Sequence, residues 1–591
     1  MAREMFRHMQ CEVYPGTGLG RGVPKSLPGV ELPHMASKRV YLETFGCQMN
    51  ELDSELVAGR LASLGYAFTS QASEADVVLY NTCSVREQAE QKVWSRLGEL
   101  RDQKADKPGM VVGVLGCMAE RDGKGLMDRM PVVDVMCGPG ELDKLPALLD
   151  NAVRTRESLV ADDPNAAVKS VKAVALQGST SRRSATLSAA EDSLEYLDLS
   201  RSVSPIDPVG SLRKSAYVRI TRGCNKFCTY CVVPFTRGAE IHRPPAHIVE
   251  ECQRLADQGV IEVTLLGQTV NHYRFEHDAA TIAGGVTQPQ KGRAFKGGHK
   301  RDPLSGERVT TFADLLYEIH EKAPGIQRLR FVTSYPRDFG DDVLEVIRDC
   351  PRICRYLHVP AQTGSDRMLK MMNRGYSVSE YDEFVCRARE HLHQPEIGRP
   401  LMISGDIIVG FPTETDEDFA QTVSLLERSR YKSCFIFKYS PRPGTVAYDK
   451  IPDDVPEAVK RVRNNELLAV QNRISDEVSR EQVGSVYDIL IEGPSQKAIK
   501  AAGLSQRQAK KASGGVQLTI GGRSADETDD LSVTAVLERT DANSVQFSGR
   551  TDGDQIVMFD ADVTDAHALP GQIRRVRITE GSGLTLFGEL V

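Results

Sequence analysis

The sequence predicts an α/β protein with three parts: an N-terminal α/β domain, a partial parallel (β/α) barrel and a small C-terminal β-barrel. Short apolar runs alternate with helical patterns from 39 to about 150, and strand-like runs recur before helices from 214 to about 475. Residues 476–591 are rich in strand-forming sequence. A chain of 591 residues also exceeds what one hydrophobic core usually organises.

The composition and the net charge indicate which class of protein the chain belongs to. With 40% hydrophobic residues, 26% charged residues and a formal net charge of -7, the chain reads as an ordinary globular protein. Any nucleic-acid binding must therefore come from local basic patches. There is no apolar run long enough to span a membrane and no secretory signal, so we expect a cytoplasmic protein without membrane attachment. The sequence does not determine the oligomeric state, for which we expect a monomer.

Shifts in composition set the expected boundaries. The chain before the first strand, 1–38, is expected to be a disordered extension or to include a wrongly assigned start, because the sequence from Met35 reads like a fresh start that leads directly into a strand. The first domain covers 39–150, and the polar, Ala-, Ser- and Arg-rich stretch 151–213 is expected to be a linker.

The two later domains each contain a polar stretch without periodicity. The barrel domain, 214–475, is interrupted at about 276–310 by a segment rich in Gly, Lys, Arg and His. The C-terminal domain, 476–591, has a similar stretch at about 496–530. We expect the first to be a surface insertion and the second to be a disordered insertion.

The strongest chemical signal is a cysteine triad in one loop. Cys224, Cys228 and Cys231 lie in GCNKFCTYC, directly after a predicted strand, where parallel barrels place their active sites. Three thiolates can hold three irons of a 4Fe-4S cluster and leave the fourth open to a small molecule, for which S-adenosylmethionine is the known ligand. A structural zinc site is the alternative, but zinc needs four ligands and His242 lies outside the loop.

A second triad is dispersed along the first domain. Cys47, Cys83 and Cys117 each follow a predicted strand, so their side chains are expected to converge at one edge of the sheet. Taken singly, each is compatible with a buried core cysteine. The remaining seven cysteines follow no such pattern and are interpreted as structural or incidental: Cys11, Cys137, Cys252, Cys350, Cys354, Cys386 and Cys434.

The two triads and their surrounding motifs resemble the methylthiotransferases, a family of radical S-adenosylmethionine (SAM) enzymes. The resemblance runs from about 39 to 591. Its motifs are TRGCNKFCTYCVVPFTRGAE at 221–240, LLGQTVNHY at 265–273, FVTSYPRDF at 331–339, HVPAQTGSDRMLKMMNRGY at 358–376, SGDIIVGFPTETDEDF at 404–419 and FKYSPRPGTVA at 437–447. SGRTDGDQIVMF at 548–559 resembles the TRAM domain, a small RNA-binding β-barrel.

The resemblance implies the cofactors and their ligands. One 4Fe-4S cluster would bind Cys224, Cys228 and Cys231 and chelate SAM, and an auxiliary 4Fe-4S cluster would bind the three cysteines of the first domain. Further cofactor contacts are expected at strand ends, namely Tyr230, Arg237, Gly267, Gln268, Ser334, Gln362 and Ser365. Thr269 departs from the family, which commonly has Asn there.

The resemblance also implies a substrate. TFGCQMN at 44–50 is similar to the branch that converts N6-dimethylallyladenosine, next to the tRNA anticodon, to its 2-methylthio derivative by radical chemistry. The ribosomal-protein branch usually has Pro-Lys in this motif and the threonylcarbamoyladenosine branch Lys-Val. Expected partners are the tRNA anticodon loop, a reductant such as a flavodoxin or ferredoxin, and a sulfur donor.

Two other functions stay open at this point. One is methylthiolation of N6-threonylcarbamoyladenosine in tRNA, and the other is a non-catalytic RNA-binding protein with a structural metal site. For either tRNA substrate, arginines of the C-terminal domain are predicted to contact phosphates, with solvated surface charge as the alternative. They are Arg539, Arg550, Arg574, Arg575 and Arg577.

Overall fold

The computed structural model describes residues 38–84, 87–162, 171–176, 197–198, 214–283, 285–292, 302, 304–503, 519–520, 536 and 543–591. The expected N-terminal extension except its last residue, most of the expected linker and most of the 496–530 insertion lie outside these ranges. Cys11 and Arg539 lie outside them as well.

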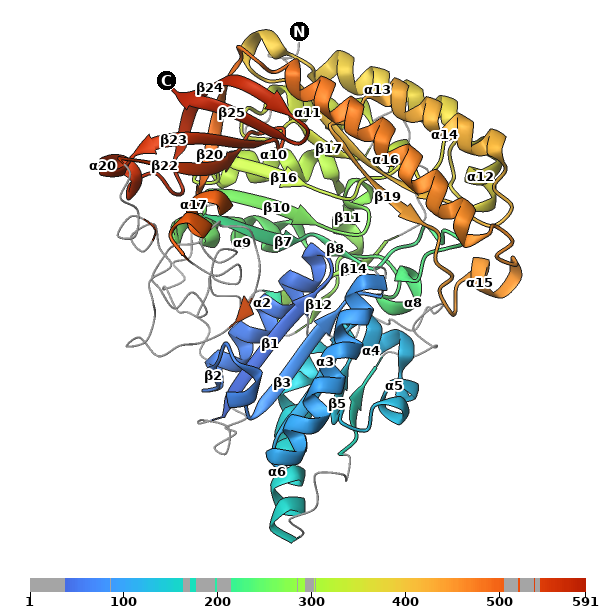
Figure 1. Cartoon of the computed structure of the whole chain (residues 1–591), viewed down its shortest axis with the longest axis vertical. Coiled ribbons are helices and arrows are strands. Elements are labelled where there is room, and N and C mark those ends of the chain that lie inside the picture. The colour runs from blue at the N-terminus through green and yellow to red at the C-terminus, as the bar shows by residue number, and fades with distance from the viewer. Residues whose placement is uncertain are drawn as a thin grey trace.

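The first domain is a parallel sheet covered by helices on both faces (Figure 1). Its strand order is β2-β1-β3-β4-β5-β6, and β21 pairs antiparallel with β1. The central strands read as continuous apolar runs because both of their faces are buried. The elements are β1 (Arg39–Phe45), α2 (Gln48–Ser63), β2 (Ala67–Phe68), β3 (Val77–Thr82), α3 (Glu87–Asp106), β4 (Val111–Gly116), α4 (Cys117–Asp122), α5 (Lys124–Arg129), β5 (Val135–Cys137), α6 (Leu145–Asp162), β6 (Ala173–Ala175) and β21 (Thr519–Ile520).

This domain continues past residue 150, where the linker was expected to begin. Helix α6 runs twelve residues further, to Asp162, and β6 pairs with β5. Ala152 and Val153 of α6 are buried in the core beside the sheet, which holds the helix together beyond the expected boundary. A three-residue strand such as β6 has too few positions to show a period in the sequence.

The second domain confirms the predicted partial parallel barrel. Six strands lie side by side in the order β7, β10, β16, β17, β18 and β19, as two three-stranded parallel sheets joined by a bridge between Leu329 and Ile353. The helices pack outside them (Figure 1). The elements are β7 (Ser215–Arg219), α9 (Pro245–Asp257), β10 (Glu262–Leu266), α10 (Phe312–Lys322), β16 (Arg328–Phe331), α11 (Asp341–Asp349), β17 (Tyr356–His358), α12 (Asp366–Met371), α13 (Val378–Leu392), β18 (Met402–Val409), α14 (Asp416–Ser429), β19 (Ser433–Lys438), α15 (Val446–Lys450) and α16 (Glu457–Arg480).

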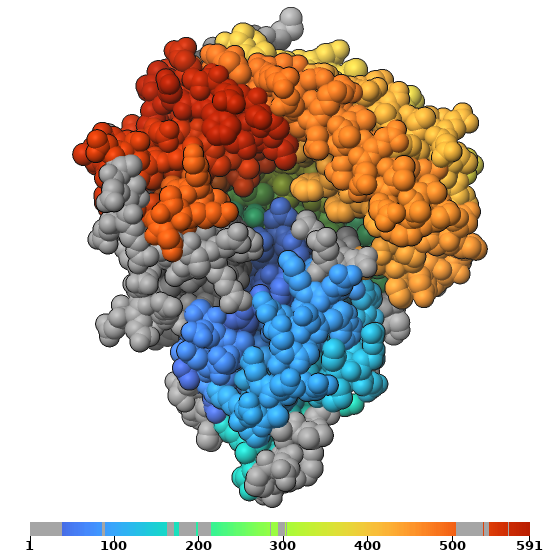
Figure 2. Space-filling model, in the orientation of Figure 1, coloured from blue at the N-terminus to red at the C-terminus, as the bar shows by residue number. Residues whose placement is uncertain are grey.

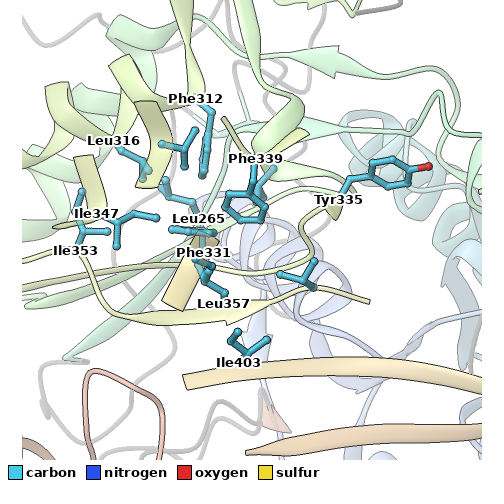
Figure 3. Close-up of a cluster of buried hydrophobic side chains, with 14 of the residues drawn as sticks. Leu265, Phe312, Leu316, Phe331, Tyr335, Phe339, Ile347, Ile353, Leu357 and Ile403 are labelled. Carbon is cyan, nitrogen blue, oxygen red and sulfur yellow. The ribbon is translucent and has the colours of Figure 1, made fainter. Parts of the chain in front are cut away.

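The core of the barrel lies between its strands and helices. Figure 3 shows strand residues such as Leu265 and Phe331 facing helix residues such as Phe312. The rings of Phe312 and Phe331 meet edge to face with centroids 5.1 Å apart, a favoured aromatic geometry. Tyr335 lies at the margin of this cluster and points its hydroxyl away from it, towards the side of the barrel where the strands end (Figure 3).

The insertion expected at about 276–310 contains short paired strands in its described part. β11 (Arg274–Glu276) pairs with β15 (Val309–Thr311), and β12 (Ile282–Ala283) pairs with β13 (Val286–Thr287). β14 (Gln290–Lys291) pairs with β9 (Ile241–His242), which in turn pairs with β8 (Thr221–Arg222), just before the Cys224 loop. Part of the insertion therefore packs behind this loop instead of lying on the open surface.

The third domain is a small closed β-barrel, as predicted. Its strands close in the order β20-β22-β23-β25-β24, and alternate residues of β23, including Val557 and Phe559, fill the interior. The expected 496–530 insertion begins with a short helix, α17. The elements are β20 (Val486–Pro494), α17 (Gln496–Ala501), β22 (Ser544–Arg550), β23 (Ile556–Asp562), α20 (Val563–Ala566), β24 (Ile573–Ser582) and β25 (Thr585–Leu590).

Helix α16 crosses the expected boundary at 475/476 and packs against both β19 and β24, so it joins the two barrels. Leu467 and Ile474 of this helix belong to the core of the larger barrel. Within the described ranges, we find no helix with the length and apolar character needed to span a bilayer.

Buried arginines fasten the C-terminal barrel to β16. Arg330 Nε donates to Glu262 at 2.7 Å, and its other two nitrogens donate to the backbone carbonyls of Thr551 and Asp552. Arg328, two residues earlier, donates to two further carbonyls of the small barrel. Side chains of the larger barrel thus satisfy backbone groups of the smaller one, which fixes how the two domains are oriented.

Replacing Arg330 with Met should loosen this interface. The Arg330→Met change leaves the Glu262 carboxylate buried without its cation, which costs about 3–5 kcal/mol of unfolding free energy for a buried pair. Urea-induced unfolding and the rate at which trypsin releases the small barrel measure the effect. Arg473→Met is the matched control, because its ion pair with Glu427 is exposed and contributes only about 0.2–1 kcal/mol. Equal losses in the two variants would contradict this account of the interface.

Candidate active site

Two cysteine triads meet at one large cavity between the first domain and the larger barrel. The cavity has a volume of about 1580 Å³, and five of the six predicted cysteines line it. Cys117 is buried behind that lining, beside Cys47. Seen from outside, the green barrel surface lies deep in the recess between the blue first domain and the orange and red C-terminal elements (Figure 2).

The first triad is built from three neighbouring strand ends. Cys47 caps α2 after β1, Cys83 follows β3, and Cys117 is the first residue of α4 after β4. Gly46 has a φ of +134°, and a Cβ on it would lie 2.4 Å from the Cβ of Cys83. Only glycine therefore permits Cys47 and Cys83 to come this close.

The surroundings of this triad favour a thiolate at one of its members. A hydrogen bond with Cys83 and the positive charge of Arg237 lower the pKa of Cys47 to about 6, against the opposing effect of burial. Burial raises the pKa of Cys117, and Arg237 opposes that rise. One arginine thus acts on two of the three thiols.

Arg237 is therefore not where the sequence analysis expected it. It was predicted to contact SAM near the Cys224 loop, but it reaches across the domain interface to the first triad. Its Nη2 donates to Asp53 at 2.7 Å, and both side chains are buried. Arg237 follows the short helix α8 (Val233–Thr236), which carries it from the second triad towards the first.

Two asparagines support the first triad and were missed by the sequence analysis. Asn50 Nδ2 donates to Asn81 Oδ1 at 3.0 Å, and Asn81 donates back to the Asn50 carbonyl at 2.9 Å. The Cys47 thiol donates to Asn50 Oδ1 at 3.2 Å. The signal was present, because Asn50 and Asn81 lie within the motifs TFGCQMN and NTC that carry Cys47 and Cys83.

The second triad lies in one tight loop after β8. Gly223 has a φ of +69°, and a Cβ on it would lie 2.0 Å from the carbonyl oxygen of Ala239, so the turn into Cys224 requires glycine. The Cys231 N–H donates to the Cys228 carbonyl at 3.0 Å, which closes the turn. The Cys224 thiol lies 3.6 Å from the hydroxyl of Thr269, the position that departs from the family.

The charge balance of the second triad fits a bound metal cluster. Burial, with a smaller effect from Glu240, raises the pKa of Cys224 to about 11. Burial also raises the pKa of Cys231, and so does the proximity of Cys228 and Cys224. Three thiolates this close repel one another unless a cation lies among them, and iron supplies that charge. The donor sets at both triads therefore fit 4Fe-4S clusters, each with an open iron.

Cations on the cavity wall lie beside the second triad. Arg374 Nη1 donates to the Cys228 sulfur at 3.4 Å, and its guanidinium lies 4.8 Å from the centre of the Tyr335 ring. Lys226 lies 4.4 Å from the same ring centre and pairs with Asp338 at 2.5 Å. Neither cation was predicted as a site residue, although Arg374 belongs to the 358–376 motif and Lys226 to the cysteine loop.

Five of the predicted cofactor contacts line the cavity: Tyr230, Gly267, Gln268, Ser334 and Gln362. Ser334 is buried, and its Oγ has no hydrogen-bond partner among the described residues. Gln362 has a φ of +75°, a strained conformation for a residue other than glycine, and pairs with β18 through its backbone. An unpartnered hydroxyl and a strained residue at strand ends are typical of a ligand site.

Ser365, the remaining predicted contact, does not belong to the cavity. It is the N-cap of α12, where its hydroxyl accepts from the Met368 N–H and donates to Asp418 at 2.6 Å. Serine has this capping role because its oxygen satisfies a free N–H of the first helical turn. The prediction of a cofactor contact at Ser365 was therefore wrong.

The predicted RNA-binding arginines separate into two groups. Arg574, Arg575 and Arg577 are exposed on β24. Arg550 instead pairs with Glu492 and Asp554, each at 2.8 Å, at the interface with the larger barrel. Its charge is already satisfied inside the protein, so the predicted phosphate contact is corrected to a structural role.

Two family models match the chain. The model described as "Uncharacterized protein family UPF0004" matches residues 39–138, and the model of the radical SAM superfamily matches residues 218–426. The first match contains the first cysteine triad and the second match contains the other triad.

Curated relatives cover nearly the whole chain. The tRNA-2-methylthio-N(6)-dimethylallyladenosine synthase of Rhodopirellula baltica is 41% identical over 94% of this chain and 96% of its own length. The chain belongs to this family of synthases. A member from Aeromonas salmonicida is 39% identical over 78% of this chain and 82% of its own length. Among solved structures, the radical SAM methyltransferase TsrM from Kitasatospora setae aligns with a TM-score of 0.45 and 15% identity, over 70% of this chain and 75% of that chain.

Membership of the synthase family makes the chain a radical SAM enzyme, with SAM and iron-sulfur clusters as its cofactors. The predicted fold class and family are confirmed. The comparisons do not identify individual ligands, so the role of each side chain depends on the geometry of the cavity.

Two serines should respond oppositely to the same substitution. Ser365→Ala removes a helix cap, so it should lower the free energy of unfolding by about 0.5–2 kcal/mol and leave SAM affinity unchanged. Ser334→Ala removes a cavity hydroxyl with no protein partner among the described residues, so it should weaken SAM binding and leave stability unchanged. Urea unfolding and anaerobic calorimetry of SAM binding to the reconstituted protein check both. Weaker SAM binding in Ser365→Ala would overturn its assignment as a cap.

Proposed function

We propose that this protein converts N6-dimethylallyladenosine, next to the anticodon of tRNA, to its 2-methylthio derivative. The observation that carries the proposal is that two cysteine triads from different domains meet at one cavity, which five of the six cysteines line. A methylthio transfer needs both a radical source and a sulfur-carrying centre within reach of the same base. A structural metal site needs neither the cavity nor the second triad.

The residues that line the cavity have different roles according to where they lie. Cys224, Cys228 and Cys231 hold the cluster that binds SAM, which when bound supplies a 5′-deoxyadenosyl radical strong enough to activate an aromatic C–H bond. Tyr230, Gly267, Gln268, Ser334 and Gln362 orient SAM from the strand ends.

The remaining side chains serve the two clusters. Cys47, Cys83 and Cys117 hold the auxiliary cluster opposite, and the positive charge of Arg237 favours the thiolate forms of Cys47 and Cys117. Arg374 donates a hydrogen bond to the sulfur of Cys228 in the other triad.

Two exposed aromatic rings give the cavity a surface for an apolar substrate. Phe435 and Phe437 point to the same side of β19, with centroids 6.4 Å apart and planes 16° from parallel, and 53% and 41% of their side chains are exposed. Exposed, stacked rings of this kind bind nucleobases and apolar groups. They favour the dimethylallyl group over threonylcarbamoyl, which carries a carboxylate.

Access by tRNA is proposed through the small barrel and the cavity mouth. Arg574, Arg575 and Arg577 supply exposed positive charge for phosphates, and the anticodon loop reaches the cavity with its base turned out of the stack. We further propose a cytoplasmic monomer that receives electrons from a flavodoxin or ferredoxin and sulfur from a separate donor.

Iron content tests the two-cluster arrangement. The anaerobically reconstituted protein should hold about eight irons per chain, and changing Cys224, Cys228 and Cys231 to Ala should leave about four. Changing the first triad to Ala should also leave about four, with the SAM-dependent radical cluster still visible by electron paramagnetic resonance. Cys386→Ala, at an exposed cysteine, is the control and should keep both clusters. A first triad that holds zinc or no metal would rule out the proposed chemistry.

The two phenylalanines test the substrate. Changing Phe435 and Phe437 together to Ala should raise the KM for dimethylallyl-modified tRNA about tenfold or more, because stacking contributes about 1–3 kcal/mol per base. Cleavage of SAM without tRNA should be unchanged. Tyr317→Ala, an exposed aromatic on α10 outside the cavity lining, is the control. Mass spectrometry of the nucleosides reports the product, and methylthiolation of threonylcarbamoyladenosine instead would refute the proposed substrate.

A further inference from the structure

Three potential metal ligands meet behind the Cys224 loop, outside the cavity. Glu240 precedes β9, His242 ends it, and His272 ends the 3-10 turn (Val270–His272) that follows β10. One ligand atom from each lies within 4.8 Å of the other two. All three side chains are at least 95% buried. Buried charged and titratable groups are rarely brought together without a partner that satisfies them.

The protein satisfies only part of this cluster. Glu240 Oε2 and His272 Nδ1 are 2.6 Å apart and share a hydrogen bond. Glu240 Oε1 and His242 Nδ1 are buried and have no hydrogen-bond partner among the described residues. Buried unpaired polar atoms are uncommon in native proteins and indicate a bound water molecule or ion.

A glycine lets the backbone of the insertion pass directly beside these ligand atoms. A Cβ on Gly292 would lie 2.8 Å from His242 Nε2 and 3.0 Å from Glu240 Oε2, so a larger residue would crowd both atoms. Gly292 is held in place, because its N–H donates to the Glu240 carbonyl at 2.8 Å and its carbonyl accepts from Asn225 Nδ2 at 3.1 Å. The close approach of Gly292 to the cluster is thus a fixed feature of the fold.

The ligand chemistry selects the kind of ion. Two imidazoles and one carboxylate form a common zinc ligand set, which leaves a fourth position for water. His242 offers a neutral imidazole, because burial lowers its pKa to about 4. Calcium and magnesium prefer oxygen ligands and do not match two histidines.

We propose that Glu240, His242 and His272 bind one Zn²⁺ ion. The ion takes the place of the proton shared by Glu240 and His272, with the remaining imidazole proton of His272 on Nε2. In a tetrahedral site with Zn–N and Zn–O distances of about 2.0–2.2 Å, ligand atoms lie about 3.3–3.6 Å apart. Separations near 4.8 Å would therefore close by about an ångström, and the 2.6 Å between Glu240 Oε2 and His272 Nδ1 would open by somewhat less. Side-chain rotation supplies that movement.

The proposed ion would link the insertion to the cluster loop. β14 of the insertion pairs with β9, which places Gln290 opposite His242. The Glu240 N–H donates to Asn225 Oδ1 at 3.1 Å, and Asn225 directly follows Cys224. Zinc at this point would therefore brace the loop of the second triad from behind. The inference does not depend on which nucleoside the enzyme modifies.

Metal analysis of the complete protein tests the proposal. The full chain, reconstituted anaerobically with both clusters, is incubated with Zn²⁺, passed over a chelating resin and analysed for zinc, iron and sulfide. We expect about one zinc per chain, falling at least tenfold in His242→Gln and in His272→Gln, with iron and sulfide unchanged. His393→Gln, an exposed histidine elsewhere, is the matched control and should keep its zinc.

X-ray absorption at the zinc edge of the unaltered protein distinguishes this site from zinc trapped by the cysteine triads. Nitrogen and oxygen neighbours at about 2.0–2.1 Å without sulfur support the proposal, whereas sulfur at about 2.3 Å overturns it. Absence of zinc after the resin step also overturns it, and would leave Glu240 and His272 as a hydrogen-bonded pair. Because this measurement uses the unaltered chain, it holds even if a histidine variant fails to fold.

Discussion

The arrangement of the active site depends on one buried carboxylate at the interface between two domains. Asp53, on α2 of the first domain, pairs with Arg237 at 2.7 Å and lies 3.7 Å from Arg219 of β7. All three side chains are at most 8% exposed. Charges buried this deeply are stable only when paired, so the domains must dock in the register that brings them together. That register sets the distance between the two cysteine triads.

The same interface explains why the cavity has reactive groups on both sides. Leu266, at the end of β10, packs in the core of the first domain, so the strand ends of the barrel are pressed against the first triad. Arg237 contributes a charge to thiols that its own domain does not contain. The cavity is therefore a property of the docked pair of domains, since each domain alone would present an open cysteine edge to solvent.

The C-terminal barrel is held by a similar principle at another face. Lys432, just before β19, is buried and pairs with Asp554 at 3.0 Å, and Arg550 pairs with the same carboxylate. These contacts neutralise the charge of Arg550 inside the protein, whereas the arginines of β24 are exposed to solvent. Strand β19 also carries the stacked rings of Phe435 and Phe437. The C-terminal barrel, which carries the exposed arginines, is therefore anchored at the start of the same strand.

The local sequence was sufficient to predict the features that depend on the order of the strands and on short spacings between residues. It determined the fold class, the two triads and most of the strand-end residues in the cavity, because a residue that directly follows a parallel strand must lie at the same edge as its neighbours. Tertiary structure alone decided the partners of individual side chains. Ser365, besides capping α12 locally, is held outside the cavity because its hydroxyl donates to Asp418, 53 residues away, and Arg237 serves the first triad because Asp53, 184 residues away, attracts it. His242, which lies too far from the Cys224 loop to complete a zinc site there, instead meets Glu240 and His272. Such contacts join distant segments through packing and charge, and no local pattern encodes them.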